Sequence, residues 1–267
     1  MRMKNVIIFL IFGLINNLYS QNNKVLKVEY NEIVSYIPSI INYDKGILYV
    51  SHLESSYKTI FSNSKNLLKS DDQTLIIQVK DEEYFSEIYL DRRDNLLFEN
   101  IFERRALKRY YSVYEKLPKM NWELINESKT IENFECKKAK TVFRGRTYVV
   151  WYSEEIPISV GPWKFNGLPG IILSVEDSEG IYKWYAKNIT YPFEGDSDLE
   201  SIKNNTEKFT KISFKDLDAK RIESLKLKMK TQKARMGQRN QSISLEFSTS
   251  QWKEPVNEFR NQVNFSF

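Results

Sequence analysis

The chain has little of the material that builds disulfide-held or metal-held folds. Its 267 residues contain one cysteine and one histidine, with nine glycines and seven prolines. A single cysteine excludes an intramolecular disulfide, and a single histidine excludes zinc sites built from several histidines and cysteines. The low glycine and proline counts argue against a linker-rich array. After the first twenty residues no apolar run is long enough for a membrane-spanning helix. Stability must therefore come from ordinary core packing.

Diagnostic enzyme motifs are also missing. There is no Walker loop, dinucleotide fingerprint or EF-hand loop, which removes the common nucleotide and calcium enzymes. A Ser/His/Asp triad would have to use His52, which has no motif around it. Paired carboxylates could hydrolyse a glycoside if they met in space. The acidic candidates are Glu154, Glu155, Glu176, Asp177 and Glu179. We expect no catalytic residue, no metal site and no cofactor.

The first twenty residues have the order of a cleaved secretory signal peptide. Arg2 and Lys4 precede an apolar run over 6–15, and a short polar stretch ends near Ser20. The pattern predicts a signal peptide over 1–20 and one domain over 21–267, exported to the periplasm or cell envelope. The remaining chain is mildly basic, and we expect at most peripheral membrane contact.

The body of the chain has the alternation of short β-strands. Aromatic residues make up 14% of the sequence, which suits strands. Apolar and polar residues alternate, with polar turns between the runs. Strands are predicted over 24–33, 46–53, 57–61, 74–80, 84–90, 122–125, 136–143, 147–152, 171–176 and 181–189. Arg144 and Gly145 are predicted to form the turn of a hairpin between 136–143 and 147–152. In 181–189, Trp184 is expected on one face and Tyr185 on the other. A polar break is expected over 126–129, and the chain turns polar again after Pro192 through Asn205. We predict a mainly β (α+β) fold built on a curved antiparallel sheet. A half-barrel is one shape that such a sheet can take. The stretch 95–118 fits either further strands or a helical turn.

A late helix is predicted from Ser213, with Asp216 completing a capping box, to about Gly237. One stripe is apolar: Ile222, Leu225, Met229 and Met236. The other faces are basic, which suits either packing on the sheet with a solvated face or contact with an anionic surface. Export argues against nucleic acid as a partner, and we expect none.

The densest group of turn formers and large apolar residues lies over 161–172. Pro169 and Gly170 predict a type II turn that leads into a strand. The stretch resembles the signature of the GLPGLI family, exported Bacteroidetes proteins of unknown function, and residues from Trp122 onward follow the same pattern. The resemblance implies a structural role for Gly161, Pro162, Gly167, Leu168, Pro169 and Gly170. It supplies no catalytic residues.

Four aromatic residues could gather near this turn: Trp151, Trp163, Phe165 and Trp184. They either line a cleft for an apolar, sugar or peptide ligand or form the core. The buried thiol of Cys136 is expected to be inert. We predict an exported, non-catalytic protein that binds a ligand or an envelope partner. A carboxylate-dependent hydrolase and a small outer-membrane β-barrel are the alternatives.

Overall fold

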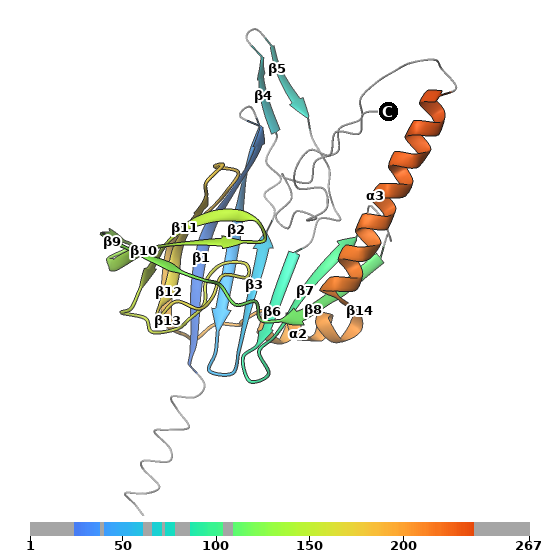
Figure 1. Cartoon of the computed structure of the whole chain (residues 1–267). Helices are drawn as coiled ribbons and strands as arrows, with labels where there is room; N and C mark the ends of the chain where they lie inside the picture. Colours follow the sequence, from blue (N-terminus) through green and yellow to red (C-terminus); the bar gives the residue numbers. More distant parts are fainter. Residues whose placement is uncertain are drawn as a thin grey trace, which may run out of the picture.

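The protein is built on one large open sheet that curls over on itself (Figure 1). The structure, a computed structural model, describes residues 24–37, 40–60, 66–70, 73–77, 86–103 and 109–237. The strands are β1 Val25–Ile37, β2 Ile40–Val50, β3 Glu54–Ile60, β4 Asn66–Ser70, β5 Gln73–Ile77, β6 Ser86–Asp91, β7 Leu96–Glu103, β8 Arg109–Lys116, β9 Glu123–Ile131, β10 Phe134–Phe143, β11 Arg146–Ser153, β12 Ile171–Asp177, β13 Tyr182–Phe193 and β14 Thr210–Ser213.

Twelve of these strands form the main sheet, in the order β14-β8-β7-β6-β3-β2-β1-β13-β12-β11-β10-β9, and β4 pairs with β5 separately. All neighbours are antiparallel except β14 and β8, which are parallel. The two edge strands, β9 and β14, do not pair with each other, so the sheet stays open. The predicted fold class, a mainly β protein with a curved antiparallel sheet, is confirmed.

Local sequence explains the clearest hairpin. Strands β10 and β11 are joined by Arg144 and Gly145, whose φ angles are 46° and 77°. Positive φ at both central residues is the geometry of a type I′ turn, whose twist matches that of paired strands. The two strands pair from Phe143 with Arg146 outward to Lys137 with Tyr152. The hairpin predicted at this place is therefore confirmed.

The main core fills the concave face of the curled sheet. In β13, Tyr182, Trp184 and Ala186 are buried, whereas Lys183 between them is partly exposed. The same alternation in β1 and β11 points apolar side chains inward from both halves of the sheet. Figure 1 shows β10 and β11 crossing in front of β1 and β2. The residues of this core come from both halves of the sheet, β1–β3 and β10–β13.

The loop between β11 and β12 is packed into this core through its glycines. A Cβ at Gly170 would lie 1.9 Å from the carbonyl oxygen of Ser153, and one at Gly161 would lie 2.7 Å from Ile172 Cβ. The predicted type II turn with positive φ at Gly170 is wrong, because the positive φ angles of this loop belong to Trp163, at 52°, and Gly167, at 92°. Gly170 is needed for close approach of two backbone segments.

Two helices pack on opposite faces of the sheet. Helix α2, Leu199–Lys208, covers the convex face of β3 and β6–β8. Its Leu199 packs against Ile47 and Tyr49 of the neighbouring strand β2. Helix α3, Phe214–Gly237, begins on the concave side at β8 and β14 with Leu217 buried. Among the described residues, neither helix has the length and apolar character needed to cross a membrane.

Helix α3 begins with the predicted cap. The backbone N–H of Asp216 donates to Ser213 Oγ over 3.1 Å, and that hydroxyl donates to the Asp216 carboxylate over 2.6 Å. Of the predicted apolar stripe, Ile222 is half-buried, and the side chains of Leu225, Met229 and Met236 lie outside the described residues.

Several other predictions meet the edge of what the structure describes. Strands β7 and β8 resolve the stretch left open over 95–118, except for 104–108, which lie outside the described residues. The predicted signal peptide over 1–20 lies outside them too. No element was predicted from the sequence between Pro192 and Ser213, where the chain is polar, and so α2 and β14 were missed.

Candidate functional site

The four aromatic residues predicted to gather do not all share one face. Trp163, Phe165 and Trp184 are buried, with exposed fractions of 3%, 2% and 0%. The indole rings of Trp163 and Trp184 are parallel within 2°, with centroids 6.3 Å apart, and Phe165 meets Trp184 edge-on. These three residues belong to the core. Trp151 lies on the opposite face of β11, so a cleft shared by all four is not formed.

Charged side chains meet where the β11–β12 loop crosses strands β7 and β8. Lys164 Nζ lies 2.8 Å from a carboxylate oxygen of Glu99 and 3.1 Å from one of Glu115. Arg144 forms a second ion pair with Glu115. The ring of Phe214 lies beneath both cations, 4.0 Å from Arg144 Cζ and 5.4 Å from Lys164 Nζ. We call these five residues the ionic cluster.

The ionic cluster is arranged for stability. The Lys164 side chain is 1% exposed, and both glutamates are 14% exposed. Each of the two carboxylates is largely buried and has a cation at contact distance, which is the arrangement of a structural ion-pair network.

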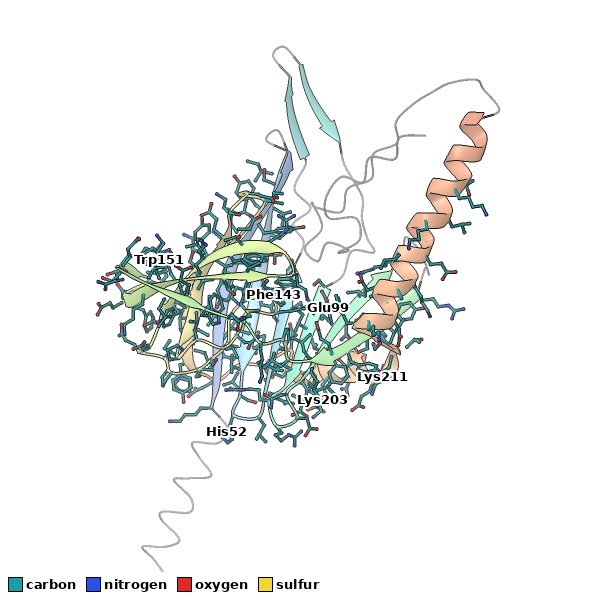
Figure 2. The ribbon with its side chains drawn as sticks, in the orientation of Figure 1. His52, Glu99, Phe143, Trp151, Lys203 and Lys211 are labelled. Atoms are coloured by element: carbon teal, nitrogen blue, oxygen red, sulfur yellow. The ribbon has the colours of Figure 1, made fainter. Side chains whose placement is uncertain are left out.

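The acidic residues proposed from the sequence for hydrolysis also have partners. Asp177 accepts a hydrogen bond from Arg146 over 2.8 Å, and Glu179 accepts one from the same guanidinium over 2.9 Å. Glu154 pairs with Lys137, and Glu155 accepts a hydrogen bond from the backbone N–H of Glu135. His52, the only histidine, lies exposed at the turn between β2 and β3. Figure 2 shows it at the end of the molecule away from Trp151.

A groove crosses the convex face of strands β11–β13, and its walls come from one row of residues. Trp151 of β11 pairs with Ser174 of β12, which in turn pairs with Tyr185 of β13. Directly paired residues point to the same side of a sheet. The row therefore places a small side chain between two large aromatic ones. The groove has a volume of about 350 Å³.

Charged residues lie at the sides of this groove. Glu176 is held by Lys183 Nζ at 2.5 Å and accepts a hydrogen bond from the Tyr185 hydroxyl over 3.3 Å. Burial is the larger cause, and the nearby charge of Glu176 the smaller one, of a raised pKa at Tyr185. The phenol therefore keeps its proton and stays a hydrogen-bond donor. Lys129 Nζ lies 4.2 Å from the Trp151 ring centroid, and partial burial lowers its pKa.

The remaining candidate chemistry is limited. Burial raises the pKa of Cys136 to about 11, so its thiol is protonated and unreactive at neutral pH. Across the part of the chain that the structure describes, no three histidine, cysteine or acidic side chains come together to hold a metal ion.

Of the two walls of the groove, Trp151 was proposed from the sequence as a binding residue, but Tyr185 was not. The alternation in β13 placed Tyr185 on the face opposite the buried Trp184, and this placement is confirmed. Nothing local in the sequence indicates that Ser174 lies between Tyr185 and Trp151, because that row depends on the register of three strands. Lys129 was read as part of a polar break, yet strand β9 runs through it to Ile131.

Comparison with known proteins gives a family and a fold. A family described as "N-glycanase peptide, N-terminal domain" matches residues 41–216. A solved structure described as PNGF-II in the C2 space group is similar, with TM-score 0.50 and 15% identity, and the match covers 75% of this chain and 33% of that one. For the structure of PNGF-II in the P21 space group the TM-score is 0.49 and the identity 14%, and the match covers 75% of this chain and 34% of that one. No curated protein matches the chain.

The chain corresponds to only part of the length of the structures that it matches. It spans about a third of the length of the PNGF-II structures. The likeness to PNGF-II in the C2 space group concerns the fold, at 15% identity.

The assignment to the GLPGLI family made from residues 161–172 was wrong. Those residues lie inside the region matched by a different family, over 41–216. The motif was misleading because Gly170 is required by its close approach to the backbone of Ser153. A packing requirement of this kind does not specify a family. By a match over most of its length, the chain belongs to the family of the N-glycanase N-terminal domain.

Proposed function

We propose that this chain is an exported, non-catalytic domain that binds glycan-bearing polypeptides for an N-glycanase whose chemistry is carried out elsewhere. The observation that carries the proposal is the family match, which is to the N-terminal domain and not to a whole enzyme. The chain spans 33% of the PNGF-II structure that it resembles. A domain that accompanies a catalytic part commonly contributes recognition of the substrate.

The chemistry of the described residues supports a non-catalytic role. The carboxylates of the ionic cluster, Glu99 and Glu115, are paired with the cations of Lys164 and Arg144. The one thiol, Cys136, is buried and protonated. A hydrolase using carboxylates, the alternative from the sequence, would need an acidic side chain free to give up a proton to a leaving group.

The groove on the convex face supports a binding role. Its aromatic walls and charged sides match the general composition of small-molecule sites, which combine apolar surface with a few polar groups. Export is supported by the order of charge, apolar run and polar stretch over 1–20. An N-glycan on a secreted or surface protein would be met in that compartment. We therefore favour a glycoprotein over the apolar or peptide ligand, or the envelope protein partner, that the sequence suggested.

The test compares two forms of one polypeptide. Ribonuclease B carries an N-glycan, and ribonuclease A is the same protein without it. We expect the chain over 21–267, immobilised on a biosensor, to bind ribonuclease B and to give no signal with ribonuclease A. We also expect no free glycan in mass spectra after prolonged incubation. Equal binding of both forms, or binding of neither, would refute substrate recognition, and released glycan would refute the non-catalytic role.

A further inference from the structure

We propose that one pyranose ring of the glycan inserts between Trp151 and Tyr185 on the convex face of β11–β13. This inference rests on the proposed function and assigns its binding site. The two aromatic side chains stand on strands that are separated by a single strand, β12, and they share one row with Ser174. We call the space between them the aromatic slot.

The width of the aromatic slot follows from sheet geometry. Adjacent strands lie about 4.8 Å apart, so side chains two strands apart are separated by roughly 9.5 Å at the backbone. A ring placed between two aromatic faces needs about 7 to 8 Å, which is two carbon contacts of 3.5 to 4.0 Å. The side chain between the two aromatic ones is the small one of Ser174, which is 3% exposed. A pyranose ring would therefore rest above Ser174, between the outer parts of Trp151 and Tyr185.

Polar groups next to the slot fit hydroxyls. Glu176 is fixed by Lys183 at 2.5 Å and by the Tyr185 hydroxyl at 3.3 Å. A carboxylate has about four lone-pair directions, so two contacts leave others for donors from a ligand. Lys129 Nζ lies 4.2 Å from the centroid of the Trp151 ring, so it is a further hydrogen-bond donor for a sugar that packs on Trp151.

This combination selects a saccharide over other ligands. The C–H faces of a pyranose are apolar and pack on aromatic rings, while its edge carries hydroxyls that both donate and accept. An acyl chain would leave Glu176 and Lys129 without hydrogen-bonding partners from the ligand. A simple anion would face the Glu176 carboxylate at the groove side. A ring with apolar faces and a hydroxylated edge matches the walls and the sides together.

The test uses ribonuclease B and its released oligomannose glycan as probes. Trp151→Ala and Tyr185→Ala are each expected to weaken binding of both probes about tenfold or more, as for side chains at the centre of a binding site. Trp151→Phe should recover part of the affinity because it restores an aromatic face. Leu124→Ala is the matched control, because Leu124 is 64% exposed on β9 and does not line the groove.

A measurement on the unmodified chain covers the case in which a variant misfolds. Titration with the released glycan should shift the indole N–H resonance of Trp151 in the NMR spectrum and leave that of the buried Trp184 in place. If wild type and both alanine variants bind ribonuclease B equally, the slot is refuted and the proposed function stands. If the wild type does not distinguish ribonuclease B from ribonuclease A, the proposed function is refuted, and the slot with it.

Discussion

Replacement of Lys164 by methionine tests whether the ionic cluster holds the fold together. Methionine keeps the length of the side chain but removes the charge that lies between Glu99 and Glu115. Breaking a buried ion pair on one side costs about 3 to 5 kcal/mol, because a buried charge loses its partner. Glu115 keeps its ion pair with Arg144, which places the expected loss near the lower end, about 3 kcal/mol.

The loss is measured by urea unfolding followed by tryptophan fluorescence. With a slope of about 2 to 3 kcal/mol per molar urea, the midpoint of Lys164→Met should fall by about 1 M. Adding Glu99→Gln should recover roughly half of the loss, because the unpaired charge is then removed as well. Lys137→Met is the control, since Lys137 pairs with Glu154 at 2.7 Å but both side chains are exposed. Its midpoint should hardly move. If Lys164→Met lowers the midpoint no more than this control, the cluster is not a stabilising element.

Three further outcomes follow from contacts described above. Gly170→Ala should cost on the order of 3 kcal/mol or more in urea unfolding, because its Cβ would lie 1.9 Å from the carbonyl oxygen of Ser153, and a wild-type midpoint would disprove that contact. Cys136, whose pKa burial raises to about 11 from an ordinary 9.0, should react with iodoacetamide at pH 8 at least about 100-fold more slowly than in urea. The hydrogen bond from Lys27 lowers the pKa of Glu29, so the charged carboxylate stabilises the fold. Glu29→Gln should therefore lower the temperature of thermal unfolding at pH 7, and this difference from wild type should disappear as the pH falls below 4.5. An equal difference at pH 3 would contradict the prediction.

The sheet could be predicted from the sequence because strand alternation is a local signal. In β13, the buried Tyr182 and Trp184 alternate with Lys183 and Tyr185, and one face follows directly from the other. The turn at Arg144 and Gly145 was equally local. Both predictions needed only neighbouring residues, and both are confirmed by the structure.

What could not be predicted depends on contacts between distant parts of the chain. The row of Trp151, Ser174 and Tyr185 requires the register of three strands. The ion pairs of Lys164 join the β11–β12 loop to Glu99 and Glu115, which lie on strands much earlier in the sequence. Family assignment failed for a related reason, since a packing motif was taken as a signature of descent.

The pairing of β1 with β13 has a consequence for how the chain folds. Val34 pairs with Tyr182, roughly 150 residues later, whereas β1 and β2 meet through a short hairpin. Non-local pairing requires a large loop to close first, so this step should be among the slowest in folding. Until β13 arrives, one edge of β1 remains open to pairing with other chains. A fragment that ends before residue 182 should therefore aggregate, even though it contains all of β1 to β12.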